Sequence, residues 1–317
     1  MIAAQAACGP VIEGTRQVWL IARDDQGVEI DSLEVTGPLA GYAHSGVDMG
    51  DQELRAMYFA QRSFEDSDAI GYDGAIPGSG QIGVRQFTMR LITQATFRQS
   101  WNATENRLWN ITSPDVGYGR TGRFAIRFKE RTGEAREIEV RRTGTPEPSN
   151  DTYAGQRGWE AWTFEVTALD PWWYGPDEVA RFENVDAATS TTLHIDNPGD
   201  RPGDLIWTIP ASTRSQSWVL PDGLGVYPSH HPKAGQRIMI PLPMIESGDI
   251  ARVDTRGHRL PFQLLGKPMS FGLVKQSRWT NPLPPRTVNA ALPITMATAT
   301  DAMIEARIHT AYERPYS

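Results

Sequence analysis

Cysteine is almost absent from this chain of 317 residues, which contains a single copy, Cys8. One cysteine cannot close an intramolecular disulfide, and a thiolate metal site normally needs several. Long apolar runs are missing as well, since no uninterrupted stretch approaches the roughly 20 residues of a membrane-spanning helix. The first ten residues lack the basic start and long apolar segment of a signal peptide. We therefore expect a protein that is made and folded in a cytoplasm, has no membrane partner and is stabilised by burial.

An excess of positive charge is also lacking. The chain has 31 lysines and arginines against 38 acidic residues, which gives a net charge of −7. Binding to a phosphate backbone needs a concentrated positive field, so this balance argues against a nucleic-acid partner. Arg136, Arg141 and Arg142 fall on one predicted strand, but glutamates alternate with them. That pattern is typical of a solvated sheet face.

Glycine and proline, in contrast, are abundant, with 29 and 23 copies that often separate short β-type runs. Such spacing favours β-sandwiches or barrels, so the expected fold class is mainly β. The length exceeds what a single core comfortably supports and suits two domains. We place the boundary after Gly175, with a first domain of residues 1–175 and a second of residues 176–317.

The first domain shows strand patterns and one helix. Strands are predicted at Val18–Arg23 and Val28–Leu33, and the alternations around Phe87, Phe124 and Ile138 predict three more. A helix is predicted from Asn102, whose spacing to Glu105 resembles a capping box, up to a stop at Pro114. No regular element is assigned between Gly37 and about Gly83. Loops of that length are usually functional, disordered or stabilised by a partner chain.

The end of the first domain combines a half-buried strand with a cluster of large rings. The strand runs through Phe164, Val166 and Ala168, and Asp170-Pro171 ends it because proline donates no ladder hydrogen bond. Three consecutive aromatics follow: Trp172, Trp173 and Tyr174. Rings of this size in a connector must pack against something. They either form a joint between domains or subunits, or fill the domain cores.

The second domain is expected to be almost purely β. Six segments alternate between apolar and polar residues, as a sandwich with two apolar inner faces requires. These segments are Leu193/Ile195, Leu205/Trp207/Ile209, Trp218/Leu220, Ile238/Ile240/Leu242, Leu292/Ile294/Met296 and Ile304/Ala306/Ile308.

Several motifs resemble catalytic or binding sites but lack the context that such sites need. Gly78 to Gly83 matches the glycine pattern of dinucleotide-binding loops, yet a strand follows it where a helix is required. Asp249, Asp254 and His258 fit a surface turn as well as a metal site. Asp170 has no second carboxylate facing it, which glycoside hydrolysis would need. We therefore expect that the protein is not an enzyme and that it binds no cofactor and no metal ion.

Particular motifs in the second half resemble a known family. They are Asp170-Pro-Trp-Trp-Tyr-Gly175, Ile195-Asp-Asn-Pro-Gly-Asp200 before Leu205-Ile-Trp-Thr-Ile209, Gly248-Asp-Ile-Ala-Arg-Val-Asp-Thr255, Trp279-Thr-Asn-Pro-Leu-Pro-Pro-Arg-Thr287 and the ending Glu313-Arg-Pro-Tyr316. Their order and spacing resemble the distal tail proteins, a class of minor tail protein, of siphophages that infect actinobacteria. The resemblance covers roughly residues 85–317, and the first 80 residues match poorly.

The resemblance implies a structural virion protein located at the tail tip. It implies a homo-hexameric baseplate hub, with an N-terminal β-barrel-like ring domain that carries one helix and a C-terminal galectin-like β-sandwich. The implied partners are the tail tube protein, the tape measure protein and the tail-tip or receptor-binding proteins. DNA would pass through the ring without specific binding. Assembly would take place in the cytoplasm of the bacterial host.

A carbohydrate-binding module that contributes to adhesion at the host surface is the alternative. β-Sandwiches with exposed tryptophans stack on sugar rings, although fold alone does not give function. Trp218, Tyr227, His230 and His231 are the candidate glycan contacts. For the hub, the candidate interdomain or assembly contacts are Trp172, Trp173 and Tyr174.

Overall fold

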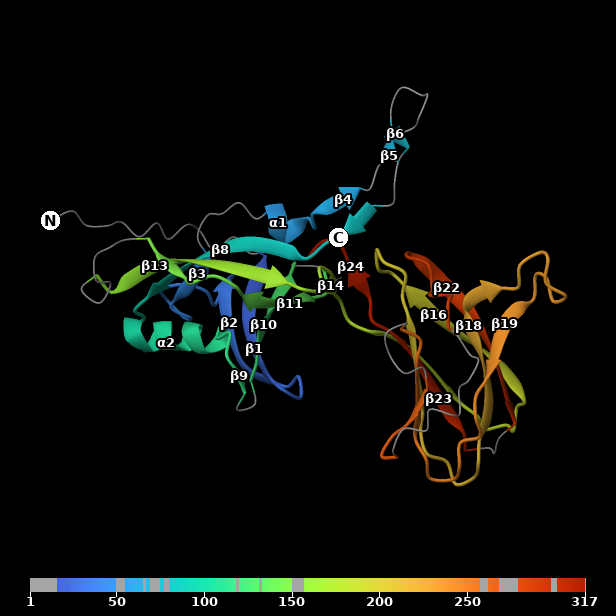
Figure 1. The fold of residues 1–317 in the computed structure, drawn as a ribbon. Helices are drawn as coiled ribbons and strands as arrows, with labels where there is room; N and C mark the ends of the chain where they lie inside the picture. The colour runs from blue at the N-terminus through green and yellow to red at the C-terminus, as the bar shows by residue number, and fades with distance from the viewer. Residues whose placement is uncertain are drawn as a thin grey trace. The chain divides into compact units, whose positions relative to one another are not determined.

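The computed structural model of the protein, drawn in Figure 1, contains two compact units. Unit 1 comprises Met1–Tyr174 with Glu313–Ser317, and unit 2 comprises Gly175–Tyr312. The expected second domain, residues 176–317, therefore ends too late, because its last five residues, 313–317, belong to unit 1. The structure describes residues 16–49, 55–64, 67–68, 75–76, 80–117, 120–130, 133–149, 157–256, 262–267, 279–297 and 301–316.

Unit 1 is built on one strongly curved sheet. The strands of unit 1 are β1 (Gln17–Asp24), β2 (Glu29–Thr36), β3 (Val47–Met49), β4 (Arg62–Phe64), β5 (Ser67–Asp68), β6 (Ala75–Ile76), β7 (Gly80–Ile82), β8 (Arg85–Gln94), β9 (Val116–Gly117), β10 (Arg120–Lys129), β11 (Arg136–Arg142), β12 (Glu147–Pro148), β13 (Trp159–Ala168) and β14 (Trp173–Tyr174). The main strand order of the curved sheet is β2-β1-β10-β11-β13-β8-β3, so β2 and β3 are its two end strands. These two end strands contact each other. The sheet is thus nearly closed, which confirms the expected barrel-like architecture.

Alternating side chains fill this barrel. On β8, Phe87, Met89 and Leu91 are buried while the residues between them are exposed. Phe124 on β10 and Phe164 on β13 are also buried. Successive side chains of a strand point to opposite faces, so each alternation places one apolar face inside. The strand predictions made around these residues are confirmed.

One long helix, α2 (Trp101–Ile111), packs against the sheet, and a single turn, α1 (Arg55–Tyr58), precedes β4. The N-cap of α2 is Ser100, whose hydroxyl accepts a hydrogen bond from the Ala103 amide, so the expected start at Asn102 is wrong by two positions. The indole of Trp101 donates to Thr93 Oγ1 at 3.1 Å, which fixes that residue in the first turn. Among the described residues, no helix is long and apolar enough to cross a membrane.

The stretch from Gly37 to Gly83 is more regular than expected. Besides β3 and α1, it contains two short antiparallel ladders, β4 with β7 and β5 with β6. Each ladder is a two-stranded sheet separate from the main sheet (Figure 1). We call β4–β7 together the ribbon.

Unit 2 is a two-sheet sandwich, as predicted. Its strands are β15 (Glu178–Glu183), β16 (Ser190–Asn197), β17 (Leu205–Ile209), β18 (Ser217–Val226), β19 (Arg237–Pro241), β20 (Ala251–Asp254), β21 (Phe262–Leu264), β22 (Thr287–Ala297) and β23 (Met303–Ile308), and the short β24 (Ala311–Tyr312) lies in neither of its two sheets. One sheet has the order β15-β23-β17-β20-β21 and the other β16-β22-β18-β19. Trp207 and Trp218 lie in the core between them. Our six segments omitted β15, β20 and β21 because these strands are short or only half-buried.

The last residues join unit 1 through arginines and aromatic rings. Arg85 and Arg136 donate hydrogen bonds to the carbonyls of Glu313 and Arg314, at 2.8 and 3.0 Å. The ring of Tyr316 lies 5.4 Å from that of Tyr58. These bonds satisfy main-chain groups that would otherwise need water, and they explain why the sequence-based boundary fails at this end.

Candidate assembly interface

The ribbon includes the strand β4, whose three residues are all exposed. In the ladder of β4 with β7, Arg62 pairs with Ile82, and Phe64 pairs with Gly80. At its base, Arg62 pairs with Glu313 at 2.6 Å, which ties β4 to the C-terminal segment. A two-stranded sheet is marginally stable in water without a further layer. The ribbon is therefore a natural place for contact with another chain.

Phe64 is displayed on this ribbon. Its side chain is 61% exposed, although Phe is usually buried. The ring lies over Gly80, where a Cβ atom would come within 2.8 Å of Phe64 Cε1. The absence of a side chain at Gly80 thus allows the ring to lie across the partner strand with its other side in solvent.

A second feature of unit 1 is a pocket of about 610 Å³, which we call the aromatic pocket. Its walls come from β1, β2, α2 and the loops at residues 39–45 and 96–98, and they include Trp19, Leu33, Leu39 and Phe97. Phe97 is 81% exposed and stacks edge-on against Tyr42, with 5.1 Å between ring centroids. Large exposed apolar groups around a hollow are typical of binding surfaces.

Charged groups hold the walls of the aromatic pocket in place. Arg107 of α2 donates to both carboxylate oxygens of Asp31, at 3.1 and 2.7 Å, and to the carbonyl of Ser32 at 2.6 Å. The hydrogen bond with Asp31 raises the pKa of Arg107. Glu34, also in the wall, is only 5% exposed and accepts a hydrogen bond from the Leu39 amide at 3.2 Å. The helix, β2 and the loop are thus joined before any ligand arrives.

The aromatic triplet at residues 172–174 divides between the core and the surface of unit 1. Trp173 is fully buried, its indole donates to the Met57 carbonyl at 3.4 Å, and its ring packs edge-on against Phe128. Trp172 and Tyr174 are half-buried. The Tyr174 hydroxyl donates to Asp170 at 2.7 Å and the Trp172 amide donates to the same side chain at 3.4 Å, so Asp170 bonds two residues of the triplet. These contacts of Trp173 are those of a core residue, and a role of the triplet in assembly stays a prediction.

The candidate glycan contacts of unit 2 do not form one surface. Trp218 is fully buried, and its indole donates to Gln216 Oε1 at 3.0 Å. The expectation that Trp218 offers a sugar platform is therefore wrong, because its ring fills the sandwich core. Tyr227 and His231 stack at 4.2 Å in the connection between β18 and β19, and His230 beside them is exposed.

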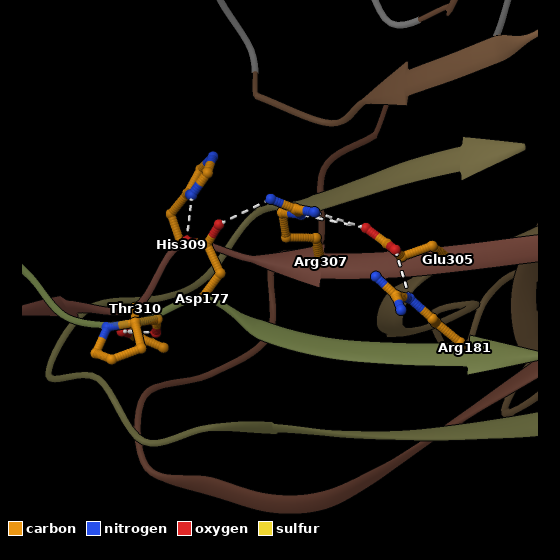
Figure 2. Close-up of polar contacts among 7 residues, drawn as sticks. Asp177, Arg181, Glu305, Arg307, His309 and Thr310 are labelled. Carbon is orange, nitrogen blue, oxygen red and sulfur yellow. Dashed lines mark hydrogen bonds and ion pairs between the residues drawn. The ribbon is translucent and has the colours of Figure 1, made fainter. Parts of the chain in front are cut away.

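Unit 2 also carries a chain of alternating charges, shown in Figure 2. Arg181 of β15 and Arg307 of β23 both bind Glu305, at 2.7 and 2.8 Å. Arg307 also pairs with Asp177 at 3.2 Å, and Asp177 pairs with His309 at 2.6 Å. Hydrogen bonding from Arg307, followed by Arg181, lowers the pKa of Glu305. The chain joins β15 to β23 and holds the segment that enters the sandwich.

Two of the motifs set aside earlier contribute residues to strands and ion pairs in the described part of the chain. Gly80 to Ile82 forms β7 and is followed by β8, while Gly78 and Ser79 lie outside the described residues. Asp249 pairs with Lys267, and Asp254 pairs with Arg256. His258 and Cys8 lie outside the described residues. Within the described ranges, no group of three or more His, Cys, Asp or Glu residues could hold a metal ion.

Two features of unit 1, Phe64 and Arg85, were not predicted from the sequence. Phe64 lies on a strand of three residues, which is too short to produce a periodic pattern. Arg85 is fully buried on β8, where it shares the inner face with Phe87 and Met89. The sequence contained a signal for Arg85, because this arginine falls on the apolar positions of the alternation. Buried arginines are rare unless they are paired, so its position predicts a buried, paired arginine.

The fold is similar to that of solved phage proteins. No protein-family model and no curated protein sequence matches the chain. The SPP1 Dit protein, described as a paradigm of the hub adsorption apparatus in phages that infect Gram-positive bacteria, is 14% identical with a TM-score of 0.50, over 83% of this chain and 98% of that chain. A chain of the phage P2 baseplate in its activated conformation with Ca is 10% identical with a TM-score of 0.53, over 96% of this chain and 100% of that chain. A chain of the phage p2 baseplate in its activated conformation with Sr is 11% identical with a TM-score of 0.50, over 91% of this chain and 100% of that chain. The chain thus shares its fold, over most of its length, with phage hub and baseplate proteins.

Proposed function

We propose that this protein is a structural component of a phage tail, the hub that joins the tail tube to the tail-tip or receptor-binding proteins. One observation carries the proposal: the likeness to hub and baseplate chains extends over both units and over 98–100% of those chains. A shared single domain would be weak support, because common folds serve many functions. A shared pairing of a barrel-like unit with a sandwich is more specific.

A ring built by unit 1 is the architecture that we propose. Cyclic assemblies need a heterologous interface, in which two different patches of one subunit meet head to tail. Unit 1 offers two such patches, the ribbon with its exposed Phe64 and the aromatic pocket. By the resemblance noted in its motifs, we propose six copies per ring.

The remaining assignments follow from this role. The proposed partners are the tail tube protein, the tape measure protein and the tip proteins, and DNA passes through the ring without specific binding. The proposed location of the protein is the tail tip of a virion. The proposed host is an actinobacterium, and assembly takes place in its cytoplasm. The proposal includes no catalytic step and no cofactor, since packing and complementary surfaces are all that a hub requires.

Electron microscopy of the phage particle that carries this chain tests the proposal. We expect density at the distal end of the tail into which both units fit, in a ring of six copies. The absence of the chain from the tail end would refute the proposal. A glycan array run beside light scattering tests the alternative, because sugar-specific binding by a monomer would favour an adhesion module.

A further inference from the structure

We propose that the aromatic pocket of one copy of this chain receives the ribbon of a second copy, with Phe64 as the inserted side chain. The inference rests on the proposed ring, and it goes further by naming the two surfaces that meet. It joins features on separate elements: β4 and β7 on one side, and the walls formed by β1, β2 and α2 on the other.

The ribbon exposes all three residues of its strand β4. Its ladders are separate two-stranded sheets, and such sheets need a further layer for stability. Phe64 packs on Gly80 with one face, while 61% of its side chain stays exposed. An aromatic residue with a fixed ring is a suitable anchor, because such residues bury a large area at a small entropic cost.

The aromatic pocket matches that anchor in size and lining. A volume of about 610 Å³ is ample for one aromatic side chain together with part of its strand. Leu39 and Phe97 line the pocket and are 55% and 81% exposed, so an entering phenyl ring would cover apolar area that is now in water. The bonds of Arg107 to Asp31 and Ser32 keep the walls in place, which reduces the cost of ordering on binding.

Charge favours the same pairing. From Arg62 to Ile82 the sequence contains four acidic residues and one basic residue, Arg62, which pairs with Glu313; the acidic residues are Glu65, Asp66, Asp68 and Asp73. The pocket presents Arg98 and His44, both on exposed loops. Glu34 has the opposite sign, but it is buried in the wall behind the Leu39 amide. The sequence of this segment is thus opposite in net charge to the exposed Arg98 of the pocket, and opposite charges favour association.

Photo-cross-linking of the full-length chain tests this pairing directly. Phe64 is replaced with benzoylphenylalanine, which keeps an aromatic ring at the position, and a control carries the same group at Val116, which is 80% exposed. Mixing this protein with an isotope-labelled copy distinguishes links between copies from links within one. We expect the probe at position 64 to mark residues 39–45 or 96–98 of the other copy. Links only within one chain, none to the pocket, or equal pocket links from position 116 would overturn the inference.

Sedimentation equilibrium provides a second readout. We expect Phe64→Ala to weaken self-association about tenfold or more, as for an aromatic anchor, whereas Val116→Ala leaves it unchanged. Arg98→Glu should weaken it most at low salt. Equal effects of Phe64→Ala and Val116→Ala would contradict the pairing. Tail-end microscopy separates the two claims, because a ring whose Phe64 lies elsewhere refutes this inference alone, and a tail without the chain refutes the hub.

Discussion

Arg85 and Glu313 lie 228 positions apart, and the guanidinium of Arg85 donates to the Glu313 carbonyl at 2.8 Å. The same guanidinium donates to the Met57 carbonyl at 2.6 Å. Burial lowers the pKa of Arg85 to about 10, so the group stays charged at neutral pH. One buried cation therefore joins α1, β8 and the C-terminal segment.

Replacing Arg85 should loosen the C-terminal segment. We expect Arg85→Ala to lower the free energy of unfolding by about 2–4 kcal/mol, because it leaves two carbonyls without a donor. Arg85→Lys should retain only part of the stability that Arg85→Ala loses, since an ammonium group lacks the fork that spans both acceptors. Chemical denaturation measures both variants, and hydrogen exchange at residues 313–316 should rise in each. Unchanged exchange there would contradict the role assigned to Arg85.

Trp173 and Trp172 should differ sharply although they are neighbours. Trp173 is fully buried against Phe128, so Trp173→Ala should cost about 3–5 kcal/mol of stability. Trp172 is half-buried, so Trp172→Ala should lower the stability much less. Thermal unfolding of the two single variants tests this. If Trp172→Ala left stability intact but prevented ring formation, the predicted role of the triplet in assembly would gain support.

Asp301 should titrate at unusually low pH. Hydrogen bonds from Thr213 and then Ser212 lower its pKa to about 2. A depressed folded-state pKa contributes stability above the unfolded value of about 3.9, and this stability is lost as pH falls from about 4 to about 2. NMR titration of the carboxyl carbon measures the pKa. Asp301→Asn should remove the contribution, whereas Asp186→Asn, at an exposed aspartate of unit 2, should not.

Asp222 should hold the segment around Thr280 in place. This buried carboxylate accepts from the amides of Thr280 and Asn281 at 3.0 and 3.1 Å, and from the Asn281 side chain at 2.6 Å. We expect Asp222→Ala to cost about 2–4 kcal/mol, because several donors lose a charged acceptor together. Hydrogen exchange at residues 279–281 should increase. A variant with native exchange there would show that the segment is held by other contacts.

The sequence was sufficient for those parts of the fold in which one strand carries a full alternation. The period of two around Phe87, Phe124 and Phe164 predicted long strands with one buried face, and these strands form the barrel. The helix was found but its start was not. Ser100 and Asn102 are both acceptable caps, and the tertiary bond of Trp101 to Thr93 fixes the start.

The candidate interface was beyond sequence reasoning. The ribbon consists of strands of two or three residues, so pairing across a long connection defines it and no local pattern does. The aromatic pocket takes its walls from elements that lie far apart in the chain, including Trp19, Leu39, Phe97 and Arg107. None of these residues forms a motif by itself. Only the closure of the sheet brings them together.

Unit 2 begins at Gly175 and ends at Tyr312, while the residues on both sides of it belong to unit 1. The sandwich is therefore an insertion, with two covalent connections to the barrel instead of one. A protease that cuts a single connection leaves the sandwich attached through the other. A module tethered in this way survives a single cut that would release a terminal domain.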